Sequence, residues 1–434
     1  MNYSNNKVSR ISLLLIVVFV LIFSFIGVDI QSSGSSETLS GADIAWMLTA
    51  SGLVLIMTPG LSFFYGGMVN RKNIISTMLQ AFITLGVVSL VWVVVGFSLA
   101  FGESVGGIIG NPNTFAFFRN VGLSPNPTFS ETIPFLLYAL FQMKFAIITP
   151  AIIIGSFAER IKFTRYLVFI VFFTLFVYCP LAHWTWHPEG LLGNMGVLDF
   201  AGGTVVHMSS GIAALVGAVV LGSRKEKKEK PSNIPFVILG TALLWFGWFG
   251  FNAGSSLGAN ADGVLAFGTT HMASATAMLT WIFMDKILGK KITALNTCIG
   301  AVVGLVAITP AAGFVTISHS IFIGAIAAIV CNLAMKIQLK SKVDDTLSVF
   351  PCHGIGGIVG MILTGIFAKE IGLYYGEYGT FWSHLKAVVI VFLFVAIVSY
   401  VILKVVNAIV PLRVSDDDEN EGLDISQHGE CYQA

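Results

Sequence analysis

Long apolar runs dominate this 434-residue sequence and limit what it can fold into. A helix needs about 20 mostly apolar residues to cross the roughly 30 Å hydrocarbon core of a bilayer. Only 11% of the residues are charged and the mean hydropathy is +0.84, whereas soluble domains carry about 25% charged residues. The runs therefore predict membrane-spanning helices, because lipid demands that each segment pair its own backbone groups. The eleven predicted spans are 42–66, 73–101, 133–157, 163–183, 201–222, 234–256, 264–286, 293–313, 318–338, 347–368 and 384–410.

A twelfth apolar run at 11–30 follows Lys7 and Arg10 and predicts either a secretory signal peptide or an extra anchor. Both alternatives place residues 31–41 outside the membrane. We therefore expect residues 1–41 to hold this segment and an external linker, 42–410 the membrane domain, and 411–434 a cytoplasmic tail. Within the membrane domain we expect two halves and a final helix, at 42–222, 234–368 and 384–410.

The lysines and arginines predict the orientation, because loops on the cytoplasmic side carry an excess of them. With eleven spans, only three of the 24 fall in loops on the side of residue 41, at Arg119, Lys369 and Lys386. Most of the others fall in the alternate loops and near the carboxyl terminus. The first helix of the membrane domain is therefore expected to start outside the cell and the acidic tail to lie inside it.

Two histidines interrupt apolar, glycine-rich runs at matched positions. His207 follows Asp199 by eight residues, and His353 follows Asp345 by the same eight. Matched positions in two five-helix halves of opposite topology are typical of an inverted repeat, whose interface holds a substrate pathway near the bilayer midplane. The alternative is that these histidines only hydrogen-bond neighbouring helices together. The match between the two positions favours a functional pair.

Several function classes find no support in the sequence. No basic block is long enough for nucleic acid, and the common hydrolytic and nucleotide-binding motifs are absent, so we expect no enzyme activity. No metal or other cofactor is expected either, because the five cysteines show no metal-ligand spacing. These are Cys179, Cys298, Cys331, Cys352 and Cys431.

Several motifs together resemble the ammonium transporter family, which includes the Amt, MEP and Rh proteins. They are PGLSFFYGGMV, FAERIKF, DFAGGTVVH, GWFGFNAGSS and HGIGGIVGMILTGIFA, with EGLDISQHGE in the tail. The likeness covers roughly residues 42–430. It implies an all-α, multi-pass protein of the cell membrane and a homotrimer with one narrow, mostly hydrophobic pore in each eleven-helix protomer.

The resemblance also implies roles for aromatic and polar side chains. An outer recruitment site for ammonium is implied at Trp186, Ser255, Phe145, Trp248 and Asp199. A pore gate is implied at Phe145 and Phe251, with Phe141 on the same helical face as Phe145. His207 and His353 are the implied twin histidines of the pore. Asp199 also fits a second role, because an Asp at a helix start caps free N–H groups. We expect it to shape the recruitment site without touching the ion.

Elementary chemistry supports these roles. Ammonium and potassium have similar size and charge, but ammonium has N–H groups to donate and a proton to lose. An apolar lumen penalises any ion heavily, so ammonium can pass as neutral ammonia where potassium cannot. Two neutral imidazoles that share a proton can hydrogen-bond that ammonia. Methylammonium is a second expected substrate.

Two alternatives stay open at this point. A redox protein would use His207 and His353 as haem ligands. An ammonium sensor would signal through a cytoplasmic partner, and relatives of this type meet a PII-type signal protein on that face. The resemblance makes such a partner an expectation here, beside the lipid bilayer.

Overall fold

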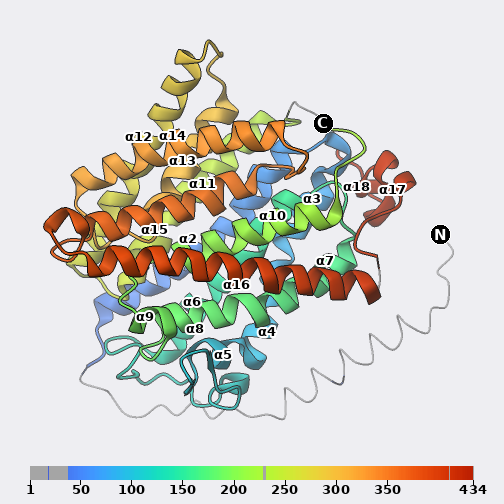
Figure 1. Ribbon diagram of the computed structural model, residues 1–434. Coiled ribbons are helices and arrows are strands. Elements are labelled where there is room, and N and C mark those ends of the chain that lie inside the picture. Colours follow the sequence, from blue (N-terminus) through green and yellow to red (C-terminus); the bar gives the residue numbers. More distant parts are fainter. Residues whose placement is uncertain (1–17, 19–37, 228–230, 410, 434) are drawn as a thin grey trace.

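The computed structural model describes residues 18, 38–227, 231–409 and 411–433 and shows a bundle of long helices (Figure 1). The apolar run at 11–30 lies outside the described residues except for Val18. Two short strands, β1 (Ser104–Val105) and β2 (Ile109–Gly110), pair antiparallel with Ser104 opposite Gly110. The expected all-α membrane fold is confirmed.

The helices come in the order α2 (Gly41–Met68), α3 (Ile74–Phe82), α4 (Thr84–Val91), α5 (Phe97–Phe101), α6 (Phe135–Phe157), α7 (Phe163–Phe173), α8 (Cys179–Trp186), α9 (Leu191–Asn194), α10 (Ser209–Leu221), α11 (Ile234–Ala253), α12 (Ala261–Ile287), α13 (Ala294–Ile308), α14 (Ile317–Lys340), α15 (Gly356–Phe367), α16 (Gly379–Ile409), α17 (Asp416–Glu421) and α18 (Leu423–His428). Short 3₁₀ turns are η1 (Arg71–Asn73), η3 (Ala116–Phe118), η6 (Gly254–Ser256) and η8 (Leu373–Tyr375). Turns of π-helix are η2 (Trp92–Gly96), η4 (Thr174–Tyr178), η5 (Gly203–Met208) and η7 (Phe350–Ile355).

Nine helical segments among the described residues are long and apolar enough to cross a membrane. Every one of the eleven predicted ranges coincides with a helical segment, but the count of eleven spans stays a prediction. Helix α12 has 27 residues and carries Asp262, Asp285 and Lys286, and α13 has only 15 residues. The predicted range 293–313 was too long, because α13 ends at Ile308, just before Pro310, which lacks a backbone N–H to donate.

The two histidine-bearing segments have the same local construction. In each, an Asp precedes a π-turn, η5 or η7, and an α-helix, α10 or α15, continues from it. The segments cross where Gly211 of α10 meets Gly354 of η7, because a Cβ on Gly211 would fall against the backbone of Gly354. This close approach brings the middle of both segments to the centre of the bundle.

Charged residues gather at one end of the bundle, which we call the tail end because α17 and α18 lie there (Figure 1). Arg224 forms ion pairs with Glu159 at 2.8 Å and with Asp344 at 2.9 Å. Burial alone would lower the pKa of Arg224, but its hydrogen bonds and charge pairing with Asp344 and Glu159 raise it. Burial alone would likewise raise the pKa of Asp344, and Arg224 lowers it instead. The cluster ties three loops together.

The carboxyl-terminal segment packs against η1 and the first turn of α3 at this same end. The Asp424 carboxylate accepts the N–H groups of Ile75 at 3.1 Å and Ser76 at 2.7 Å. The Asn73 side chain accepts the N–H of Leu423 at 2.8 Å. The tail is thus an ordered part of the fold, held by contacts between residues nearly 350 positions apart.

Replacing Arg224 by alanine would leave two carboxylates, each 5% exposed, without their cation. Breaking a buried ion pair on one side costs about 3–5 kcal/mol, and we expect a loss of that order in the free energy of unfolding, measured in mixed micelles. Lys225→Ala is the matched control, because the pair Lys225–Asp416 is 51% and 67% exposed and contributes about 0–1 kcal/mol. Equal losses for the two variants would contradict this assignment.

Candidate functional site

The side chain of Asp199 is fully engaged as a cap on η5. One carboxylate oxygen accepts the N–H of Gly202 at 2.8 Å and of Gly203 at 2.6 Å. The other accepts both the N–H and the hydroxyl of Thr204, at 2.7 Å and 2.5 Å. Gly202 has φ of 114°, a left-handed conformation that favours glycine and that lets the chain turn back onto the carboxylate. Asp199 therefore fixes where η5 begins.

Asp345 does the same for η7. Its two oxygens accept the N–H groups of Val349 at 3.0 Å and Phe350 at 2.8 Å. The equal spacing of carboxylate and histidine therefore has a structural reason, because each cap sets the start of the π-turn that carries a histidine. The π-turns themselves could not be read from the sequence.

The two histidines are in direct contact. The Nδ1 atoms of His207 and His353 lie 3.3 Å apart, and the side chains are 1% and 5% exposed. The ring centroids are 5.4 Å apart, which leaves no room for a porphyrin between them and excludes the alternative of haem held between this pair. In an Nδ1–Nδ1 hydrogen bond one ring donates and the other accepts. The Nε2 atom of His207 is buried and has no hydrogen-bond partner among the described residues.

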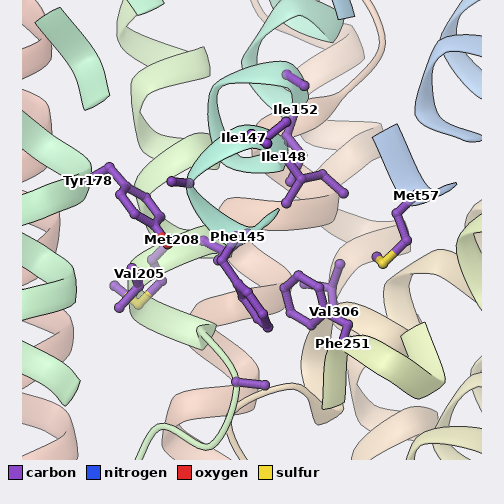
Figure 2. Packing of buried hydrophobic residues seen from close by; sticks show 14 of the residues in the cluster. Met57, Phe145, Ile147, Ile148, Ile152, Tyr178, Val205, Met208, Phe251 and Val306 are labelled. Carbon is purple, nitrogen blue, oxygen red and sulfur yellow. The ribbon is translucent and has the colours of Figure 1, made fainter. Parts of the chain in front are cut away.

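A stack of aromatic rings lies beside the histidines. Phe251 packs against Phe145 with centroids 4.3 Å apart, and against His207 at 6.0 Å. Figure 2 shows the rings of Phe145 and Phe251 side by side, one from α6 and the other from α11. Trp248 stacks on His207 at 5.4 Å, and its indole N–H donates to Thr309 at 3.0 Å.

Further along the stack, Phe145 meets Phe141 at 5.0 Å and Trp186 at 5.9 Å. The indole N–H of Trp186 donates to the backbone carbonyl of Asp199 at 3.0 Å. Ser255, in η6 directly after α11, donates its hydroxyl to the carbonyl of Phe251 at 2.9 Å. The structure thus connects all nine residues singled out from the sequence through contacts between rings, side chains or backbone.

Two small cavities adjoin the histidines. The first is lined by apolar side chains of α2, α6, η5, α11 and α13, together with His207, His353, Trp248 and Phe251. The second continues toward the tail end, between Met68, Leu347 and His353. Each has a volume of about 10 Å³, enough for about one water-sized molecule. Sequence reasoning missed these apolar lining residues, because nothing separates them from lipid-facing ones.

Histidines and carboxylates also occur away from the histidine pair. Among the described residues, no group of three or more histidine, cysteine, aspartate or glutamate side chains could hold a metal ion. The conspicuous pair His183 and His187 stacks at 4.4 Å. Both ring nitrogens of His183 are taken, by Ser104 at 2.9 Å and the Ala100 carbonyl at 3.0 Å.

Comparison with known proteins agrees with this architecture. The model of the Ammonium Transporter Family matches residues 45–432. The ammonium transporter of Bacillus subtilis is 46% identical over 401 residues, which is 90% of this chain and 98% of that protein. That of Aquifex aeolicus is 47% identical over 405 residues, covering 91% and 94%.

Solved structures show the same fold. The crystal structure of Saccharomyces cerevisiae Mep2 superposes with a TM-score of 0.82 at 33% identity, covering 88% of this chain and 89% of that one. A structure described as a sensor Amt protein gives a TM-score of 0.83 at 30% identity, covering 89% and 98%.

Asp199→Asn tests the role of the cap. An amide offers one acceptor oxygen, so donors that now meet the second carboxylate oxygen lose their acceptor, each at a cost of about 1–3 kcal/mol. We expect a lower thermal unfolding midpoint, measured by fluorescence in detergent. Thr204→Val removes one of the four hydrogen bonds and should lower the midpoint less. An unchanged midpoint for Asp199→Asn would contradict the cap.

Proposed function

Because this chain belongs to the ammonium transporter family, we propose that it binds ammonium beside Phe145, removes one proton and conducts ammonia past His207 and His353. The observation that carries the proposal is the closed, apolar passage at the histidines. The 4.3 Å contact between Phe145 and Phe251 and the cavities of about 10 Å³ leave no room for a hydrated ion. A molecule that passes must lose its hydration shell. An ion without that shell is costly in free energy in an apolar passage.

Recruitment is assigned to the ring of Trp186, the ring of Phe145 and the hydroxyl of Ser255. Aromatic faces attract a cation by about 0.5–2 kcal/mol, according to its desolvation. The Ser255 hydroxyl donates its proton to the Phe251 carbonyl. The lone pairs of the hydroxyl oxygen therefore point elsewhere and can accept an N–H. Ammonium offers that N–H and potassium does not. Trp248 lies deeper, against His207.

Asp199 acts in this scheme by position. Four donors already occupy its carboxylate, which has about four acceptor sites, so it has little capacity left for the ion. Its backbone carbonyl holds the indole of Trp186 in place. The carboxylate charge still favours a cation nearby, so Asp199 contributes to recruitment without contact.

The gate is assigned to Phe145 and Phe251, with Phe141 supporting Phe145 from the same face of α6. The rings must separate briefly for each molecule that passes. Beyond them, the histidine whose Nδ1 donates to the other ring keeps Nε2 as an acceptor, while the accepting ring keeps an Nε2–H donor. The pair therefore presents both an acceptor and a donor to ammonia while each ring stays neutral.

We place the tail end of the bundle in the cytoplasm, because the loops there carry most of the lysines and arginines. Three copies forming a homotrimer, with a pathway in each, and a PII-type partner on the tail end complete the proposal. The second candidate function is an ammonium sensor. The likeness to the structure described as a sensor Amt protein favours it, at a TM-score of 0.83.

Uptake by purified protein in liposomes tests the proposal. Phe145→Ala, His207→Ala and His353→Ala should each reduce the initial rate of methylammonium or ammonium uptake. We expect the two histidine variants to lose about tenfold, the effect of about 1.4 kcal/mol in one lost hydrogen bond. Phe246→Ala is the matched control, because that ring is 57% exposed on the outside of α11, and it should transport normally.

The unsubstituted protein separates the two candidate functions. Measurable uptake above that of empty liposomes supports transport. Ammonium binding without uptake, in protein that elutes and unfolds normally, would favour the sensor instead. Histidine variants that transport at the full rate would contradict the assignment of the pathway.

A further inference from the structure

A larger cavity, unrelated to the histidine pathway, lies at the tail end. It has a volume of about 270 Å³, near the lower end of the range of small-molecule pockets, about 300–1,000 Å³. One wall is the loop after α2 and the other is the carboxyl-terminal segment. The lining residues are Asn70, Arg71, Lys72, Asp424, Ile425, Cys431 and Tyr432. Neither the fold nor the proposed transport uses this space.

The charged side chains that line the cavity are two cations, Arg71 and Lys72, and one carboxylate, Asp424, which leaves one formal positive charge in excess. Among the described residues, no carboxylate lies within 4.0 Å of Arg71, whose guanidinium faces the ring of Tyr432 at 5.9 Å. Lys72 lies 3.6 Å from Glu226, which is 72% exposed, so this pair contributes little, and the Lys72 ammonium donates one hydrogen bond to the Asn420 carbonyl at 2.7 Å. The carboxylate of Asp424 accepts two backbone N–H groups of α3, which hold it at the wall of the cavity.

We propose that this cavity is an anion site that takes a phosphate group. The fork of N–H donors on Arg71 matches two phosphate oxygens, and Lys72 supplies a second cation. The face of Tyr432 and the half-exposed Ile425 offer apolar contact to the rest of the ligand. The phosphate comes from a soluble organic phosphate or from a lipid headgroup, and the experiment below separates these sources.

The contacts of Tyr432 connect the anion site to the packing of the carboxyl-terminal segment. Its hydroxyl accepts the side-chain N–H of Asn233 at 2.9 Å, and its ring lies 6.0 Å from Phe236 at the start of α11. It also packs against the small apolar cluster of Val69, Ile74 and Ala158, against which Leu347 packs as well. Leu347 lines the cavity next to His353. An anion that joins Arg71 to Tyr432 would therefore fasten the tail beside the end of the histidine pathway.

Cys431 supplies a native reporter of occupancy. It lines the cavity and is exposed, while the other four cysteines are buried. The experiment follows maleimide labelling of Cys431 in phosphatidylcholine nanodiscs, with pyrophosphate as probe and chloride to match ionic strength. We expect pyrophosphate to slow labelling several-fold in a saturable manner. Arg71→Gln should abolish this protection. Lys340→Gln should retain it, because Lys340 is an exposed lysine at the end of α14 and does not line the cavity.

A second arm identifies the source of the phosphate. Protection without pyrophosphate in phosphatidylglycerol nanodiscs, again lost in Arg71→Gln, supports a lipid headgroup at the same site. Protection by pyrophosphate in phosphatidylcholine supports a soluble ligand. Unchanged labelling in both arms would overturn the proposal, as would equal protection of Arg71→Gln.

A measurement on the unsubstituted protein guards against a variant that fails to fold. The thermal unfolding midpoint should rise with pyrophosphate concentration, because a ligand of the folded state stabilises it by mass action. Chloride at matched ionic strength should not produce this rise. A midpoint that follows ionic strength alone would overturn the proposal.

Discussion

The structure depends on keeping two imidazole rings uncharged in contact with each other inside an apolar bundle. A charged side chain in the middle of a bilayer costs about 3 kcal/mol or more, and a histidine avoids that cost because its neutral form is available at physiological pH. The 3.3 Å contact between His207 and His353 uses one polar atom of each ring. What is left is a donor and an acceptor suited to a small neutral molecule.

Backbone caps and a close glycine contact position the pair. Asp199 and Asp345 cap the π-turns η5 and η7, and the glycine contact between Gly211 and Gly354 lets the two segments cross closely. At the tail end, Arg224 follows α10 and pairs with Asp344 in the loop that leads into η7. The buried carboxylates are thus stabilised by hydrogen-bond donors or by a partner cation, and the lining of the proposed pathway is mostly apolar.

Hydropathy predicted the helical segments well, because a run of about 20 apolar residues is the length that a helix needs to cross the membrane. It failed at 309–313, because α13 ends at Ile308, just before Pro310. It also could not predict the π-turns, because hydrogen bonds between residues i and i+5 have no distinct amino-acid composition. The site residues came from motif likeness. The spacing from aspartate to histidine was visible in the sequence, but the reason for it, a cap on each π-turn, appears only in three dimensions. Contacts of the tail, such as Asp424 with Ser76, are non-local and left no pattern.

Paired flux measurements in proteoliposomes test most directly whether an apolar passage selects by proton loss. Ammonium and potassium are offered at equal concentration and equal membrane potential, and the entry of each is followed by its own electrode. The account predicts ammonium entry well above that of empty liposomes and potassium entry indistinguishable from them. Potassium entry at a rate comparable to ammonium would contradict it, because potassium has no proton to lose.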